Sequence, residues 1–203
     1  MENLRLIVGL GNPGAEYAKT RHNAGFLLVE RLAKRWRTDW TNERKFDARL
    51  AWSERDGVRV LLCQPQTFMN ASGEAVGALV NFYRLTRPWP GLLVAMDDAD
   101  LPLGEIRMRP GGGSGGHHGL ESIGGHLGAD EFARLRLGIG PAKPDARDLT
   151  GHVLGRFAAD EAARMEKVLD RAADQVECWL AAGIEKAMNQ FNGNVEKVNE
   201  LNG

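Results

Sequence analysis

The sequence is poor in cysteine, in long hydrophobic runs and in net charge. Its 203 residues include two cysteines, Cys63 and Cys178, which lack the spacing of a metal or redox motif. No apolar run approaches the roughly 18 residues that a transmembrane helix needs, and the N-terminus lacks the basic, apolar and small-residue pattern of a signal peptide. We therefore expect a cytoplasmic protein with reduced thiols and no membrane partner.

The formal net charge of −1 at pH 7 does not by itself indicate a nucleic-acid partner. The first part of the chain is more basic than the rest, and the C-terminal helical stretch is acidic. This distribution is compatible with a local phosphate-binding face and equally with ordinary solvated surfaces. The hydrophobic content of 43% is enough for one sizeable core, so we expect one domain over residues 1–193, followed by a polar tail at residues 194–203.

Short apolar runs alternate with helical patterns along the chain, which is typical of the α/β class. The runs predict strands at residues 4–10, 46–52, 58–62, 92–96, 105–109 and 135–139. The helical patterns predict helices at residues 23–37 and 72–83, a short one from residue 117, and a long amphipathic one over residues 160–190. Asp56-Gly57 indicates a hairpin, so we expect a single domain with a mixed, twisted β-sheet flanked by helices.

The stretch over residues 4–25 presents a carboxamide and an imidazole from neighbouring segments. Its apolar strand ends in turn chemistry, which delivers Asn12 to the carboxyl end of the strand, where open α/β sheets carry their ligands. His22 follows just before a helical pattern. The glycines of this stretch also match a dinucleotide-binding fingerprint, as in a nicotinamide oxidoreductase. Pro13 and the late start of the helix argue against that interpretation.

Polar residues follow three of the predicted strand ends: Asn12, Asn70 and Asp97. If they converge with His22, the imidazole could be a general base and the carboxylate of Asp97 could fix its tautomer. Because no serine or cysteine lies in a nucleophile elbow, water would be the nucleophile. Taken singly, however, each residue is explained better by a structural role, in which His22 caps or precedes one helix and Asn70 caps the next.

The aspartates near residue 97 admit a second interpretation as a cation site. Asp97, Asp98 and Asp100 could bind a divalent cation together with a histidine, either His117 or His118. The spacing lacks the later glycine and glutamate of a calcium loop. A polar turn after the strand therefore explains the aspartates better, and we expect no metal.

A glycine-rich loop and two arginine pairs are further candidates for ligand contacts. Residues 111–116 could allow close approach of a bulky ligand or form a flexible connector. Arg107 with Arg109, and Arg134 with Arg136, share a strand face in each pair, which suits phosphate binding. Most such arginine pairs are simply exposed to solvent, so the pattern alone favours solvent-exposed arginines over a phosphate site.

Five stretches together resemble the bacterial peptidyl-tRNA hydrolase family, over nearly the full length and in the same order. They are LIVGLGNPGAEYAKTRHNAG, QPQTFMNASG, VAMDDADLPLG, RMRPGGGSGGHHGL and RLRLGIG. The resemblance implies a single-domain α/β fold that is usually monomeric and needs no metal or other cofactor. It also implies hydrolysis of the ester between a peptide and the 3′ ribose of tRNA, which rescues stalled peptidyl-tRNA.

The resemblance assigns roles to individual residues. His22 is similar to the base that activates water, Asp97 to its partner, and Asn12 to the residue that distinguishes a blocked N-acyl group from a free amine. Arg109 and Arg136 match a basic pair that clamps the 5′-phosphate of tRNA. The positions that match the peptide and 3′-adenosine site are Tyr17, Phe68, Met69 and Asn70.

At one position the sequence departs from the family pattern, which is usually Gly-Gly-His-Asn-Gly. Here it reads GGHHG, so His118 stands where the family has a substrate-contacting asparagine. A neutral imidazole offers one donor and one acceptor and can substitute, but it titrates near pH 6.5 when unperturbed. The alternative to an enzyme is a non-catalytic RNA-binding relative. The joint presence of Asn12, His22, Asn70 and Asp97 argues against it.

Overall fold

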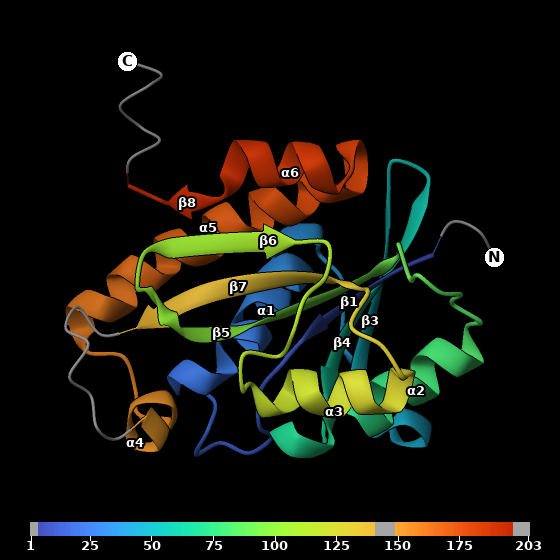
Figure 1. Ribbon diagram of the computed structural model, residues 1–203, viewed down its shortest axis with the longest axis horizontal. Helices are drawn as coiled ribbons and strands as arrows, with labels where there is room; N and C mark the ends of the chain where they lie inside the picture. Colours follow the sequence, from blue (N-terminus) through green and yellow to red (C-terminus); the bar gives the residue numbers. More distant parts are fainter. Residues whose placement is uncertain (1–3, 141–148, 197–203) are drawn as a thin grey trace.

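An eight-stranded mixed sheet forms the centre of the structure, a computed structural model that describes residues 4–140 and 149–196 (Figure 1). The strands are β1 (Leu4–Gly9), β2 (Thr41–Glu43), β3 (Ala48–Arg55), β4 (Val58–Pro65), β5 (Leu92–Pro102), β6 (Glu105–Arg109), β7 (Ala133–Gly140) and β8 (Gly193–Asn194). They lie in the order β2-β3-β4-β1-β5-β7-β6-β8. β1 runs parallel to β4 and β5, β5 runs parallel to β7, and the other pairs are antiparallel. The predicted α/β class with a mixed sheet is confirmed.

Helices cover both faces of the sheet (Figure 1). One face packs against α1 (Ala24–Trp36), α5 (Ala159–Ala182) and α6 (Ile184–Phe191). The other packs against α2 (Ser72–Phe82) and α3 (His118–Leu127). Successive residues of a strand point to opposite faces, so in β1 Ile7 joins the first core and Leu6 the second. Burial of each such side chain stabilises the fold by roughly 1.5–3 kcal/mol.

In the described part of the chain, four short helical segments lie near the edge of the sheet where the parallel strands end. They are η1 (Arg21–Asn23), η2 (Arg44–Phe46), η3 (Met69–Ala71) and α4 (Leu149–Leu154). η1 and η3 directly precede α1 and α2, and each follows a loop that leaves the carboxyl end of a parallel strand. The loops that position His22 and Asn70 are therefore anchored at both ends, by a strand and by a helix. No helix among the described residues is long and apolar enough to cross a membrane.

The predicted polar turn after residue 96 is wrong, because β5 continues to Pro102. Asp97 and Asp98 pair in register with Leu137 and Gly138 of β7. Aspartate is disfavoured in strands, but here β7 supplies a parallel partner and both carboxylates are bonded by side chains from other elements. These tertiary contacts override the local preference.

The long C-terminal helix is present, but it ends earlier than predicted. α5 stops at Ala182, and Gly183 adopts φ 84° and ψ 172°, a conformation that breaks the helix and favours glycine. α6 then packs against α5, where Gln175 Nε2 donates to Ala187 O at 3.0 Å. Beyond it, β8 pairs with β6. The expected tail, residues 194–203, thus begins in β8, and its residues 197–203 lie outside the described residues.

Candidate active site

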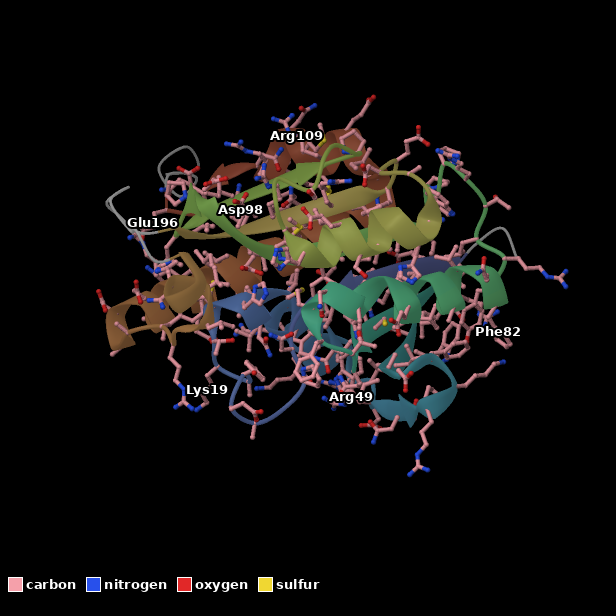
Figure 2. The ribbon with its side chains drawn as sticks, turned by 60° about the horizontal axis from the view of Figure 1, so that its bottom comes forward. Lys19, Arg49, Phe82, Asp98, Arg109 and Glu196 are labelled. Atoms are coloured by element: carbon pink, nitrogen blue, oxygen red, sulfur yellow. The ribbon has the colours of Figure 1, made fainter. Side chains whose placement is uncertain are left out.

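A cleft of about 520 Å³ opens at the carboxyl ends of β1, β4 and β5. Its walls come from the loops after β1 and β4, from the carboxyl half of β5 itself, from Arg136 of β7, from the glycine-rich loop before α3, and from α4. All the predicted site residues except Tyr17 and Arg109 line it. Tyr17 is half-buried in the loop after β1, and Arg109 is exposed at the end of β6, at the edge of the molecule (Figure 2). The structure therefore brings most, but not all, of the predicted site together.

His22 and Asp97 meet because α1 approaches the ends of β1 and β5 very closely. Gly25 permits this approach: a Cβ there would lie 2.3 Å from Ala95 O and 2.4 Å from Leu10 N. η1 consequently places His22 beside the end of β5. His22 Nδ1 lies 3.0 Å from each carboxylate oxygen of Asp97. The side chain of Asp97 is 3% exposed and that of His22 is 15% exposed.

His117 is a third member of this cluster, and the sequence interpretation missed it as a partner of Asp97. Its Nε2 lies 3.0 Å from Asp97 Oδ1, and its Nδ1 accepts a hydrogen bond from Gly119 N at 3.2 Å. Because Nδ1 is an acceptor, the proton of the neutral ring sits on Nε2, which donates to Asp97. The available sequence signal was the position of His117 directly before a helix, two residues ahead of a backbone N–H that it caps.

The carboxylate of Asp97 is kept ionised by its two histidine neighbours. Burial alone would raise its pKa, but the hydrogen bonds from His117 and His22, together with their electrostatic attraction, outweigh burial and lower it. An ionised carboxylate only accepts hydrogen bonds, so Nδ1 of His22 carries a proton. Nε2 of His22 is then left as the ring nitrogen that can accept a proton in the cleft.

The same three side chains offer one ligand atom each within 4.8 Å of one another, a spacing that a metal ion could occupy. A cation needs a free lone pair on each ligand nitrogen, whereas Nε2 of His117 carries the proton that it donates to Asp97. The cation site considered from the sequence also fails to assemble. Asp98 Oδ2 pairs with Arg136 Nε at 2.5 Å, and Asp98 Oδ1 accepts from Asp100 N at 3.0 Å. The residues fit a hydrogen-bonded cluster better than a metal site.

Asn12 is held rigidly at the floor of the cleft. Its backbone N–H donates to Asn23 Oδ1 at 2.9 Å, and Asn23 Nδ2 donates back to Asn12 O at 3.0 Å. Its own Oδ1 accepts from Met69 N at 2.8 Å. These contacts fix the orientation of the amide and leave Nδ2 as the group that can donate to a ligand, since within the described part of the chain it donates to no other residue.

The rim of the cleft is more exposed than its floor. Phe68 is 60% exposed, and Asn70 and His118 are exposed as well, whereas Met69 is buried. Asn70 lies within η3, and the N-cap of α2 is Ala71, so the helix-cap role considered for Asn70 is not observed. Exposed side chains that surround a buried polar floor can contact a ligand without reorganising the core.

The arginines of β6 and β7 have separate environments although they share a face of the sheet. Arg107 pairs in register with Arg136, and Arg109 with Arg134. Arg136 lines the cleft and is 29% exposed, with its Nε bonded to Asp98. Arg134 is only 3% exposed. The predicted solvated pair at Arg134 and Arg136 is therefore wrong for Arg134, which is enclosed by the loops that flank α3.

Comparisons with known proteins agree over almost the whole chain. The family model described as peptidyl-tRNA hydrolase matches residues 6–200. A peptidyl-tRNA hydrolase of Gloeobacter violaceus is 49% identical over 93% of this chain and 94% of its own length. One from Desulforudis audaxviator is 49% identical over 93% of each chain. The crystal structure of peptidyl-tRNA hydrolase from Acinetobacter baumannii has a TM-score of 0.86 at 41% identity and covers 96% of this chain and 97% of that one.

Proposed function

This chain belongs to the peptidyl-tRNA hydrolase family and hydrolyses peptidyl-tRNA, and we propose that His22 activates the water that attacks the ester. The observation that carries the proposal is the contact of His22 Nδ1 with the carboxylate of Asp97, 3.0 Å to each oxygen. This contact leaves Nε2 as a proton acceptor on a ring that lines the cleft. A positioned base of this kind accelerates a reaction by roughly 10²–10⁴-fold.

In this mechanism, the proton that His22 takes from water is later returned to the leaving group. Nε2 of His22 takes a proton from water as the water oxygen bonds to the ester carbonyl carbon. The imidazolium is stabilised by Asp97, which His117 holds in place. When the tetrahedral intermediate collapses, the bond to the ribose 3′ oxygen breaks and the imidazolium returns its proton to that oxygen. The products are a tRNA with a free 3′ hydroxyl and a peptide with a free carboxyl group, which then releases its own proton to water at neutral pH.

Asn12 is proposed to select substrates whose amino group is blocked. Its Nδ2 is a donor at a fixed position, because Oδ1 is already bonded to Met69 N. The carbonyl of an N-acyl group accepts a hydrogen bond from such a donor. A free α-amino group is protonated at neutral pH and offers only donors, so it leaves the amide unpaired and loses binding. Phe68 and Asn70 at the rim are proposed to contact the peptide or the 3′-terminal adenosine, together with Tyr17 and Met69.

The tRNA is proposed to approach from the side of β6 and β7. Arg136 lines the cleft there, and Arg109 lies further out on the neighbouring strand. Asp98 bonds Nε of Arg136, which leaves the two terminal nitrogens of the guanidinium for a phosphate. His118 is proposed to replace an asparagine as a hydrogen-bonding group beside the substrate. We further propose that the enzyme is a cytoplasmic monomer with one domain over residues 1–193, and that it acts without a metal.

The test is a comparison of two substrates at saturating chelator. N-acyl-aminoacyl-tRNA should be hydrolysed in the presence of EDTA, and free aminoacyl-tRNA should not. Under the same conditions His22→Ala should lose activity and retain tRNA binding. Loss of activity on chelation, or hydrolysis of both substrates at equal rates, would contradict the proposed mechanism or the proposed role of Asn12, respectively.

A further inference from the structure

Arg134 carries a charge in a place where a charge is costly. Its side chain lies on β7, is 3% exposed, and has its pKa lowered mainly by burial. Within the described residues it forms no ion pair with a carboxylate. Its Nε is buried without a hydrogen-bond partner. A buried, unpaired cation destabilises a fold unless other contacts compensate, so the contacts that hold this guanidinium explain why it is here.

The guanidinium of Arg134 joins two loops. Its Nη1 donates to Gly113 O in the glycine-rich loop that precedes α3, at 2.9 Å. Its Nη2 donates to Asp130 O in the loop that follows α3, also at 2.9 Å. The guanidinium carbon lies 4.9 Å from the centroid of the Phe132 ring, which covers it. One side chain therefore fixes the entry to α3 and its exit at the same time.

The glycine-rich loop needs such an anchor because its backbone has unusual freedom. Gly112, Gly115 and Gly116 have φ values of 136°, 60° and 80°, a region that is open mainly to glycine. The loop leads directly to His117, whose N–H donates to Ser114 O at 3.1 Å. A shift of the loop would thus move the ring that donates to Asp97.

We propose that Arg134 is a positioning residue for catalysis: it holds the glycine-rich loop so that His117 keeps Asp97 in place. The route runs from Arg134 to Gly113, through one intervening residue and two glycines to His117, and from His117 to Asp97. This inference rests on the proposed function, in which Asp97 orients His22. Arg134 does not contact the substrate, and it acts only through the geometry of the cluster.

The chain offers a matched control in Arg171. Its guanidinium also bonds two backbone carbonyls, Phe191 O at 3.3 Å and Gln190 O at 3.0 Å, and it also lies over an aromatic ring, that of Phe191 at 5.1 Å. These contacts join α5 to the end of α6, away from the cleft. Arg134→Ala and Arg171→Ala therefore remove the same kind of contact from a catalytic loop and from a purely structural joint.

The experiment measures kcat and KM of both alanine variants on N-acyl-aminoacyl-tRNA, with and without guanidinium chloride at millimolar concentration, well below the denaturing range. Arg134→Ala should lose kcat, by up to roughly 100-fold for a misplacement near 1 Å, with KM little changed. Guanidinium ion should restore part of the loss, because it fits the cavity and can bond both carbonyls, whereas methylammonium should not. Arg171→Ala should keep its kcat and show no rescue. Equal losses in both variants without rescue would overturn the proposal.

If Arg134→Ala folds poorly, the variant Arg134→Lys and an NMR measurement on His117 still test the proposal. Arg134→Lys keeps the charge but cannot bridge two carbonyls with a planar fork, so it should fold and still lose kcat. The ¹⁵N shifts of His117 report directly whether Nδ1 stays an acceptor and Nε2 a donor. Altered His117 signals with unchanged kcat would count against the proposed role of the cluster in catalysis. Unchanged signals and unchanged kcat would overturn the role of Arg134 alone.

Discussion

Ionisable side chains meet in two regions of this molecule, and the two regions differ in burial and in redundancy. At the carboxyl end of β5, one carboxylate with 3% exposure, that of Asp97, accepts hydrogen bonds from two imidazoles. Between α1 and α5, an ion-pair belt joins two arginines to four acidic side chains that are 34% to 63% exposed. The members of this belt are Arg31, Arg35, Glu166, Asp170, Asp174 and Glu177.

The comparison shows in which of the two regions a single substitution should change the reaction rate. Each arginine of the belt has more than one acidic partner, and water can replace any of them. In the cluster, each hydrogen bond determines the proton position of the next ring, and the protein provides the partners. Exposed ion pairs are worth roughly 0.2–1 kcal/mol, whereas removal of a partner from a buried charge leaves that charge unsatisfied. Substitutions in the cluster should therefore affect the rate, and substitutions in the belt should affect little.

The largest effect is expected for His22→Ala. Removal of the proposed base should lower kcat by roughly 10²–10⁴-fold with little change in tRNA affinity, since the loss is confined to proton transfer. Single-turnover hydrolysis and a filter-binding assay measure the two quantities. The matched control is His126→Ala, which removes an exposed imidazole whose bond is to Ser122 O within α3. Near-normal turnover of His22→Ala would remove His22 from the mechanism.

Asp97→Asn should have the next largest effect on the rate. An asparagine has one oxygen for two ring N–H donors, and its NH₂ group can stabilise the wrong tautomer of His22, so we expect a loss of roughly 10²-fold or more in kcat. His117→Gln tests the same contact from the other side and should lose less, because His22 keeps its own bond to the carboxylate. If Asp97→Asn retained the wild-type rate, the proposed orientation of His22 would be wrong.

The pH dependence of the free energy of unfolding gives a second test of Asp97. The pKa of Asp97 lies below its ordinary value of 3.8, because the histidine contacts outweigh burial. A lowered pKa contributes stability that is fully present above the unfolded-state pKa and is lost as the pH falls through the native one. Asp97→Asn should therefore weaken the acid-range dependence of the free energy of unfolding. Urea titrations at several acidic pH values measure it, and an unchanged dependence would contradict the lowered pKa.

Arg136→Ala should act on binding and leave the chemical step intact. Each phosphate contact that is lost should flatten the log–log salt dependence of tRNA binding by roughly 0.7–0.9. KM for full-length substrate should rise, while a minimal substrate without the acceptor-stem phosphate should be hardly affected. Arg87→Ala is the control, since its exposed side chain pairs with Glu131 outside the cleft. Equal losses on both substrates would point to misfolding or to a direct role in catalysis.

Much of the fold follows from local sequence patterns, and the failures have identifiable causes. The apolar run of β1 and the hairpin at Asp56-Gly57 lie where the local pattern predicts them, and the apolar stripe of α5 correctly predicts a long helix that begins near residue 160. The end of β5 does not lie where the pattern predicts it. Aspartates continue a strand only when a neighbouring strand pairs with it and side chains from other elements bond their carboxylates. The break at Gly183 was missed because glycine within a helical pattern is often tolerated.

The candidate site was predictable as far as its residues follow strand ends. Asn12 and His22 follow β1, Asp97 lies in the carboxyl half of β5, and the parallel pairing of β1 with β5 brings these positions to one edge of the sheet. The partnership of His117 with Asp97 depends on the path of the glycine-rich loop, which no periodicity encodes. The burial of Arg134 depends on two loops that meet only in the folded chain. The position of His117 before a helix signals only a cap, and the burial of Arg134 has no local sequence signal.

His118 should have a moderate effect that depends on pH. It lines the cleft with His22, and while neutral it can accept one hydrogen bond and donate another. Protonation would remove the acceptor and add a positive charge in the cleft where His22 must take up a proton. His118→Asn should therefore keep activity at neutral pH and simplify the acidic limb of kcat/KM to one group, while His118→Ala should be weaker at every pH. Superimposable profiles between about pH 5 and 8, where histidine titrates, would make His118 a bystander.

The smallest effect is expected for Arg35→Ala, which tests whether a substitution in the ion-pair belt leaves the reaction rate unchanged. Arg35 pairs with Asp174 at 2.6 Å and with Glu177 at 3.2 Å. Glu177 also accepts a bond from Trp36 Nε1 at 2.7 Å, so it keeps a partner when the arginine is removed. Arg35→Ala should lower the free energy of unfolding by roughly 0.2–1 kcal/mol per pair. The difference from the wild type should shrink in about 1 M salt, where charges are screened within roughly 3 Å. kcat and KM should stay unchanged, because Arg35 lies near the C-terminal end of α1, whereas His22 precedes the N-terminus of that helix and no belt residue lines the cleft. A loss of activity comparable to that of Asp97→Asn would mean that α1 transmits strain to His22, and that the belt and the cluster are not independent.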